Sequence, residues 1–133
     1  MATVPLIPDA DAEADAAVQT VFDDIRQTRG TDFINNFWRA LAADPPLLTA
    51  TWTRLKGVMG PGALDPLTKE LIYVAVSTAN GCSYCVHSHT AAARAKGMTP
   101  QQHGEFLAVL AMAMQTNSLA TALQVPVDPA FEA

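Results

Sequence analysis

The residues best suited to chemistry lie in one segment, residues 70–89, with the sequence ELIYVAVSTANGCSYCVHSH. It contains both cysteines of the chain, Cys82 and Cys85, as a C-x-x-C pair, together with two of the three histidines. Thiols at this spacing can close a disulfide across one helical turn, as redox-active pairs do. Two cysteines so close together indicate redox or metal chemistry rather than a structural staple.

Helical geometry sorts the candidate side chains of this segment. Successive residues of an ideal helix are rotated by ~100°, so Cys85 and His89 lie ~40° apart and Cys82 within ~60° of Cys85. His87 lies ~140° from Cys82 and is expected to point elsewhere. Cys82 begins the helix, where the dipole favours a thiolate, and His89 can accept a proton from Cys85 directly or through a water. We therefore predict a cluster of Cys82, Cys85 and His89 without His87.

Glu70 is the one carboxylate of the segment, at the start of the run 71–76, which is apolar on every side and is predicted to be buried. On a helix Glu70 shares a face with Val74 and Ser77. If that face meets the next helix, Glu70 can orient His89 or relay protons to it, and it must then be paired or have a raised pKa. The alternative is an exposed Glu70 in a first helical turn.

The elements that position these residues are predicted to be helices. Half of the 133 residues are hydrophobic, many of them alanine, and only 7% are aromatic, which favours close-packed helices over sheet. We expect an all-α bundle of about six helices, with the C-x-x-C pair at the N-terminus of a core helix. The expected helices are 9–29, 34–43, 45–59, 66–79, 82–96 and one from Thr99-Pro100, with a further turn at 117–123.

Particular residues mark the predicted helix ends and one predicted core face. Asp44 and Asp65 are expected N-caps, each followed by proline, whereas Asn80-Gly81 and Gly97 are expected helix ends. Arg94 and Lys96 have the charge that a helix C-terminus favours. The last long helix is expected to bury Phe106, Leu107, Val109, Leu110, Ala113 and Met114.

Composition also limits the compartment and the partners. A net charge of −5 argues against a nucleic-acid-binding surface. No apolar run approaches the ~20 residues of a membrane span, and the acidic N-terminal segment does not resemble a secretory signal. We expect one cytoplasmic domain over residues 1–133, with extended arms at 1–8 and 124–133.

The spacing of four candidate residues resembles a known motif. Glu70, Cys82, Cys85 and His89 form the pattern E-x11-C-x2-C-x3-H. This resembles the core motif of the alkylhydroperoxidase D (AhpD-like) family, within the carboxymuconolactone decarboxylase superfamily. The resemblance covers residues 64–115 and includes the Asn80-Gly81-Cys82 turn and Gly97.

The resemblance implies an all-helical, thiol-dependent peroxidase that reduces small hydroperoxides and assembles as a homotrimer or homohexamer. Cys85 resembles the cysteine that attacks the peroxide, Cys82 the one that donates a proton and then forms the disulfide, and Glu70 with His89 the proton relay. A dithiol such as a lipoyl group, or a thioredoxin-like protein, is the implied reductant. No cofactor and no resident metal are expected.

One position departs from the family pattern. Well-studied members have a second histidine directly before the second cysteine, where this chain has Tyr84. Tyrosine, with an ordinary pKa near ~10, is a poor base at neutral pH but can still donate a hydrogen bond. Tyr84 is therefore an auxiliary candidate, and a packing role is its alternative. His87 and His103 are expected to be surface residues.

Three alternatives to the peroxidase stay open on the sequence. Cys82, Cys85 and His89 could hold zinc if Glu70 or His87 supplied a fourth ligand. The decarboxylase branch of the superfamily acts on a lactone acid without a cysteine pair, and the intact C-x-x-C argues against it. The third alternative is a redox-sensing or assembly role without turnover.

Overall fold

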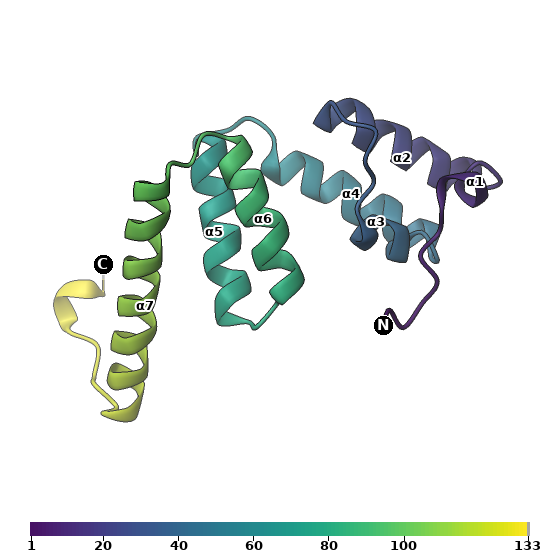
Figure 1. The fold of residues 1–133 in the computed structure, drawn as a ribbon. Coiled ribbons are helices and arrows are strands. Elements are labelled where there is room, and N and C mark those ends of the chain that lie inside the picture. Colours follow the sequence, from purple (N-terminus) through teal and green to yellow (C-terminus); the bar gives the residue numbers. More distant parts are fainter. Residues whose placement is uncertain (133) are drawn as a thin grey trace. The chain divides into compact units, whose positions relative to one another are not determined.

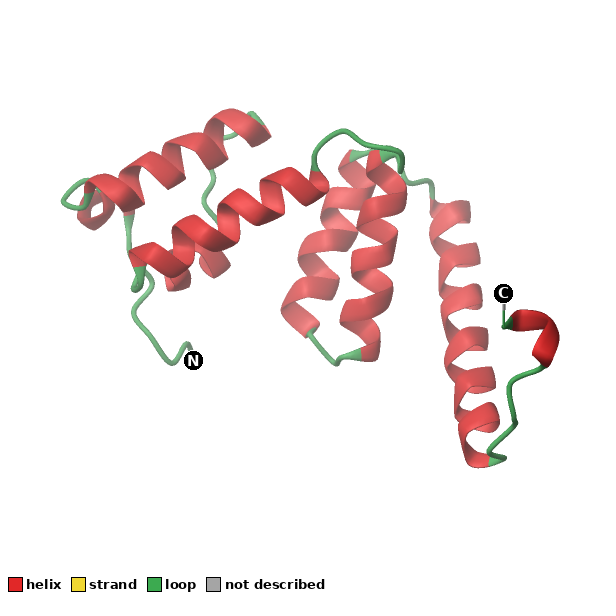
Figure 2. Ribbon diagram, turned by 180° about the vertical axis from the view of Figure 1, so that it is seen from behind, coloured by secondary structure: helices red, strands yellow, loops and turns green. Residues whose placement is uncertain are grey.

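The computed structural model describes residues 1–132, and within that range the chain contains α-helices, one short 3-10 helix and no strand (Figure 2). The predicted all-α class is therefore confirmed. The helices, labelled in Figure 1, are α1 (Asp9–Ala12), α2 (Ala16–Arg29), α3 (Asn36–Leu41), α4 (Pro45–Met59), α5 (Pro66–Ala79), α6 (Ser83–Ala95) and α7 (Pro100–Ala122), followed by the 3-10 helix η1 (Pro129–Phe131).

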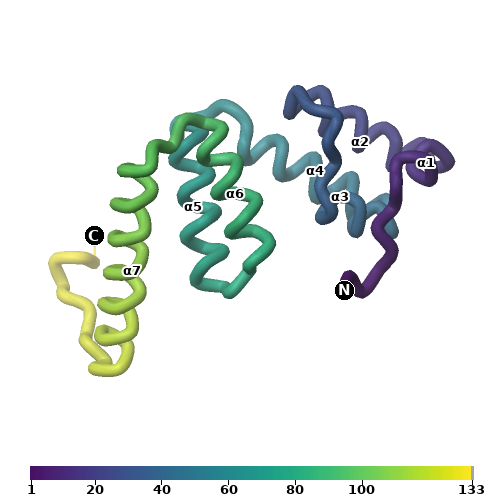
Figure 3. Tube along the Cα trace, viewed as in Figure 1, coloured from purple at the N-terminus to yellow at the C-terminus, as the bar shows by residue number. Residues whose placement is uncertain are grey.

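The chain divides into two compact units, Met1–Gly60 and Pro61–Ala133. All the candidate site residues belong to the second unit. The assignment of residues 1–133 to one domain stays a prediction. Residues 1–8 precede α1 without helix, as expected for an arm, whereas the expected C-terminal arm contains the single turn η1, which the sequence pattern did not predict (Figure 3).

The first unit has the larger apolar core, built where α2 packs against α4. Trp38 and Trp52 meet edge to face with ring centroids 5.3 Å apart, and the Trp52 Nε1–H donates to Asp24 at 2.6 Å. Other core residues are Ala12, Val18, Val21, Phe22, Ile25, Ile34, Ala42 and Leu48.

The predicted helix 9–29 is two helices, so that prediction was wrong at residues 13–15. The carboxylate of Asp15 accepts hydrogen bonds from the backbone N–H groups of Ala17 and Val18. An aspartate in this arrangement begins a helix and competes with continuation of the preceding one. The predicted end of this segment is confirmed: α2 ends at Arg29, and its C-cap Gly30 adopts a left-handed φ of 64°.

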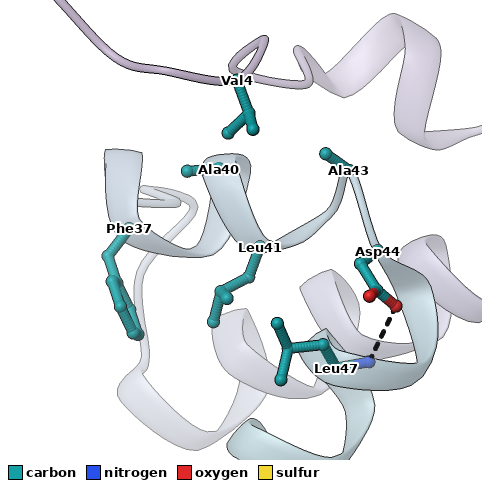
Figure 4. A pocket seen from close by; sticks show the side chains of 7 residues that line it. All are labelled: Val4, Phe37, Ala40, Leu41, Ala43, Asp44 and Leu47. Atoms are coloured by element: carbon teal, nitrogen blue, oxygen red, sulfur yellow. Dashed lines mark hydrogen bonds between the residues drawn. The ribbon is translucent and has the colours of Figure 1, made fainter.

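A shallow apolar pocket of about 330 Å³ lies in this first unit, between α3, the start of α4 and the N-terminal segment (Figure 4). Its one carboxylate, Asp44, points at the backbone N–H of Leu47 and caps α4, as predicted. The pocket contains none of the candidate site residues. Its lining is Val4, Phe37, Ala40, Leu41, Ala43, Asp44 and Leu47.

The second unit is centred on α5 and α6, which lie side by side and run in opposite directions (Figure 1). Asp65 caps α5 by accepting from the N–H of Thr68 at 2.9 Å, as predicted. The helix ends in a Schellman motif: Gly81, with φ 70°, donates to Thr78, and Cys82 donates to the carbonyl of Ser77. This turn delivers Cys82 directly to the N-cap of α6.

The apolar run 71–76 is not buried on all sides, which corrects the prediction. The buried residues of α5 are Glu70, Val74 and Ser77, the face shared with α6, whereas Ile72 and Val76 are about half exposed. The reason is that the main contacts of α5 within this unit are with α6 and α7.

Helix α7 also differs from its prediction. It is one helix as far as Ala122, so the separate turn expected at 117–123 belongs to it. None of its residues is buried; Phe106 and Leu110 are half-buried, and the other predicted core positions are exposed. A helix that is apolar on every side needs neighbours on every side, and the main contacts of α7 are with α5. Its exposed apolar residues include Leu107, Val109, Met112, Met114 and Leu119.

The core of the first unit yields a stability prediction. Leu48 is fully buried and Leu47, its neighbour on α4, is half exposed. Leu48→Ala is expected to lower the free energy of unfolding by about 2–5 kcal/mol, because it leaves a cavity among packed side chains. Leu47→Ala, the matched control, is expected to cost less than about 1 kcal/mol. Urea unfolding measures both, and equal losses would contradict the described core.

Candidate active site

The candidate site lies where α5 and α6 meet, and three of its four predicted residues come from or just before α6. Cys82 is the N-cap of that helix and Cys85 lies in its first turn, while His89 follows one turn later. Glu70 lies on the buried face of α5. Two helices joined by the tight Gly81 turn therefore bring together residues 19 positions apart.

The cysteine pair is a disulfide in this structure. The two Cα atoms are 5.4 Å apart, within the range that disulfides require, and the Sγ of Cys82 also accepts from the backbone N–H of Cys85 at 3.3 Å. Cys82 thus occupies the helix position where free N–H groups and the dipole stabilise a thiolate once the pair is reduced. The prediction that Cys82 begins this helix is confirmed.

Glu70 is buried, with 4% of its surface exposed, so the alternative of an exposed first-turn glutamate is wrong. Its carboxylate has a partner on each oxygen. Oε2 lies 2.7 Å from Nδ1 of His89, and Oε1 accepts a hydrogen bond from the ammonium of Lys96. The expected contact between Glu70 and His89 is therefore present, with a third residue added to it.

Opposing effects act on the pKa of Glu70. Burial is the largest of them and, by itself, raises the pKa, because it removes water from the charged form. The hydrogen bonds from His89 and Lys96, together with the positive charge of Lys96, lower the pKa and prevail. Glu70 therefore has a lowered pKa and is ionised at neutral pH.

The ionised carboxylate determines which nitrogen of His89 carries a proton. A carboxylate can only accept, so Nδ1 carries the hydrogen and donates it to Glu70. In the neutral imidazole the other nitrogen, Nε2, is then the basic one. The ring itself is stacked on Tyr73, with centroids 3.8 Å apart and planes 16° from parallel. Glu70 and Tyr73 together hold the orientation of His89.

Sequence reasoning missed two of these contacts. The sequence predicts Lys96 only as a favourable positive charge at the C-terminus of its helix. It places Tyr73 in the apolar run 71–76 without distinguishing it from the other residues there. Tyr73 is three residues after Glu70 and four before Ser77, so helical spacing gave it a weak signal. For Lys96 no spacing rule relates its side chain to α5.

The remaining sequence candidates lie outside this arrangement. His87 is exposed, and its Nδ1 lies 2.8 Å from the carbonyl of Ser83, consistent with the prediction that it points elsewhere. Tyr84 is 44% exposed beside Cys85. His103 is half-buried in the first turns of α7. Among residues 1–132, no group of three or more His, Cys, Asp or Glu side chains has the arrangement of a metal site.

Residues 45–128 match the carboxymuconolactone decarboxylase family, a segment that includes the whole site and well over half of the 133 residues. The chain belongs to this family. Within the carboxymuconolactone decarboxylase family it is AhpD-like, which confirms the resemblance drawn from the motif. The solved alkylhydroperoxidase AhpD core of Rhodospirillum rubrum is 65% identical, with a TM-score of 0.98 over 100% of this chain and 98% of that one.

Curated relatives in the family are more distant. The alkyl hydroperoxide reductase AhpD of Solibacter usitatus is 40% identical over 49% of this chain, and uncharacterized protein 4 in the cox locus of Paracoccus denitrificans is 43% identical over 42%. These matches span only 35% and 50% of the two relatives, respectively. The chain thus spans half or less of the length of these curated relatives. Within residues 1–132, no helix is long and apolar enough to cross a membrane.

The lowered pKa of Glu70 predicts a pH-dependent stability. A carboxyl group whose pKa is lower in the folded than in the unfolded state stabilises the fold above its ordinary value of 4.5, and loses that contribution as the pH falls through the folded value. Glu70→Gln is expected to lower the free energy of unfolding by about 1–3 kcal/mol near neutral pH, with a difference from wild type that shrinks on acidification.

Denaturant unfolding at a series of pH values measures this difference. Glu105→Gln, which changes an exposed carboxylate on α7, is the matched control and is expected to be close to neutral throughout. A Glu70→Gln deficit that stays constant down to the most acidic pH would show that the charge of Glu70 does not supply the stabilisation.

Proposed function

We propose that the chain is a thiol-dependent peroxidase that reduces hydroperoxides through Cys85 and Cys82, with Glu70 and His89 as its proton relay. The observation that carries the proposal is the buried Glu70 carboxylate hydrogen-bonded to Nδ1 of His89, one helical turn beyond a closed Cys82–Cys85 disulfide. The alkylhydroperoxidase name of the Rhodospirillum structure and the alkyl hydroperoxide reductase name of the Solibacter relative support an enzyme of this general type.

The first step uses the reduced pair. The thiolate of Cys85 attacks the terminal oxygen of the hydroperoxide ROOH, so that an S–O bond forms and the O–O bond breaks. The leaving alkoxide takes a proton, supplied by Cys82 and the relay, and departs as the alcohol ROH. Cys85 is oxidised to a sulfenic acid while the peroxide is reduced.

The second step closes the pair. The thiolate of Cys82 attacks the sulfur of Cys85, an S–S bond forms, and the hydroxyl group takes a proton and leaves as water. In sum, two thiols and one hydroperoxide become a disulfide, an alcohol and water. The disulfide present in the structure corresponds to the end of this sequence.

The proposed roles of Glu70 and His89 in proton transfer rest on the hydrogen bond between them. With Nδ1 bound to Glu70, the basic Nε2 of His89 can take a proton from a cysteine thiol and return it to a leaving oxygen. Glu70 stabilises the imidazolium that forms in between. Tyr84, at the position of the family's second histidine, is an auxiliary hydrogen-bond donor in this scheme rather than a base.

Turnover requires that the disulfide be reduced again. We propose a dithiol reductant, of lipoyl type or on a thioredoxin-like protein, which exchanges with the Cys82–Cys85 disulfide and is itself oxidised to a disulfide. The first turn of α6 has the exposure that such an exchange needs, since Cys82 and Cys85 are half-buried rather than enclosed. The proposed setting is the cytoplasm, where dithiol reductants are kept reduced.

Replacement of the attacking cysteine tests the function. Cys85→Ser is expected to lower peroxide consumption with a dithiol donor by at least ~100-fold, because a serine hydroxyl is a far weaker nucleophile than a thiolate. Cys82→Ser is expected to slow the first step, because one proton donor is lost, and to stop the reaction after it, so that a sulfenic acid accumulates on Cys85, detectable by mass spectrometry. Undiminished turnover in the Cys85 variant would exclude the mechanism.

The two histidines of α6 supply a matched control. His89→Ala is expected to slow peroxide consumption by about 10²–10⁴-fold, the usual contribution of general acid–base catalysis. His87→Ala, on the same helix but exposed and bonded to Ser83, is expected to leave the rate within about threefold of wild type.

Metal analysis of protein purified with a reductant tests the zinc alternative, and roughly one zinc per chain would favour it over the peroxidase.

We also propose that the chain assembles as a homotrimer or homohexamer. Helix α7 exposes apolar residues on several faces, and the outer face of α5 exposes Ile72 and Val76. Contiguous apolar surface on a folded protein usually marks an interface.

Light scattering on purified protein is expected to return three or six times the chain mass. Met112→Asp, which puts a charge on an exposed apolar position of α7, is expected to shift the mass downward. A wild-type mass of one chain would contradict the assembly.

A further inference from the structure

Lys96 makes a contact that its position in the sequence does not explain. It is the C-cap residue of α6, where a lysine usually extends into solvent near the last carbonyl groups. Here its ammonium instead donates to Oε1 of Glu70, on the neighbouring helix. The Lys96 side chain is 38% exposed and the Glu70 side chain only 5%. The lysine therefore reaches from the surface to a buried carboxylate.

The end of α6 holds Lys96 in place. Gly97 adopts a left-handed φ of 91° and donates to Arg94, while the N–H of Met98 donates to the carbonyl of Ala93. These two bonds form a Schellman motif, and its accompanying apolar contact is available because Ala93 and Met98 are both buried. The backbone of Lys96 is thus fixed at a defined place beside α5. Little conformational freedom remains except along the lysine side chain itself.

We propose that Lys96 is a positioning residue of the proton relay: its ammonium holds Oε1 of the buried Glu70 carboxylate, so that Oε2 stays directed at the Nδ1–H of His89. This inference rests on the proposed function, because it assigns Lys96 a part in the same relay. Lys96 itself makes no hydrogen bond to a cysteine among the described residues.

The physical reason is that a buried carboxylate must have both oxygens satisfied. Without Lys96, Oε1 would lose its charged donor, and burial would favour the protonated carboxyl group. A protonated Glu70 carries its hydrogen on one oxygen and no longer offers His89 a charged acceptor. His89 would then lose the interaction that selects its tautomer and stabilises its imidazolium.

Other ionisable side chains lie on the helices around Glu70, and they differ from Lys96 in their contacts. On α5, Tyr73 stacks on His89, and Lys69 precedes Glu70. Arg94 on α6 and His103 and Glu105 on α7 make no hydrogen bond or ion pair with Glu70 among residues 1–132. Lys96 and His89 are the two side chains whose interactions lower the pKa of the Glu70 carboxyl group.

The pH profile of peroxide reduction tests the proposal. Lys96→Met is expected to lower the rate near neutral pH by about tenfold and to move the acidic limb of the profile upward by about one pH unit, because Glu70 then protonates more readily. Lys96→Arg restores the charge and the donors, and it is expected to return both values most of the way to wild type. Arg94→Met removes the same charge from the same helix end and is expected to change neither.

A second measurement does not depend on turnover. Carbon-13 NMR of the Glu70 carboxyl group follows its titration in the protein itself, and its midpoint is expected to rise in Lys96→Met and to stay near wild type in Lys96→Arg and Arg94→Met. If Lys96→Met does not fold, as judged by circular dichroism, Lys96→Gln takes its place, since it removes the charge and keeps a donor.

The outcomes separate the two proposals. An unchanged Glu70 midpoint in Lys96→Met, or in Lys96→Gln where that variant replaces it, overturns the role of Lys96, whatever the activity. A raised midpoint together with an unaltered pH profile also overturns it, because Lys96 would then be structural. A wild-type protein that does not reduce peroxide refutes the proposed function, while the NMR titration still decides whether Lys96 controls the charge of Glu70.

Discussion

A single buried carboxylate accounts for much of the arrangement of the second unit. Glu70 lies on the face of α5 that meets α6, where an unsatisfied charge would be costly. Its two oxygens are satisfied by His89 and by Lys96, one from the middle and one from the end of α6. The charge therefore ties the two helices together, and the same tie fixes the imidazole that the proposed chemistry uses.

The turns at the ends of α5 and α6 make this tie possible. Both helices end in Schellman motifs, at Gly81 and at Gly97, and each motif fixes the backbone of a residue that belongs to the site or contacts it. The first places Cys82 at the N-cap of α6, and the second fixes the backbone of Lys96 at its far end. The ends of both helices are therefore set by backbone hydrogen bonds rather than by long side chains.

The family assignment concerns the whole fold, whereas the site geometry concerns the four motif residues. The Rhodospirillum structure matches the whole chain at 65% identity, so its fold is shared throughout. Of the four motif residues, Glu70 is hydrogen-bonded to His89, one helical turn beyond the Cys82–Cys85 disulfide, and Tyr84 departs from the pattern of well-studied members. A tyrosine there replaces an imidazole next to Cys85, so Glu70 and His89 carry the proposed relay without a second histidine.

The sequence alone determined the helical class, the α5 and α6 boundaries and the grouping of Glu70, Val74 and Ser77 on one face, because capping residues and helical periodicity act over a few positions. Tertiary structure decided the rest. Whether Glu70 was buried or exposed depended on which helix covered it, and the contacts of Lys96 and Tyr73 depended on how two helices align across a turn. The same limit explains the errors at residues 71–76 and in α7, since an apolar residue is buried only where a neighbour covers it.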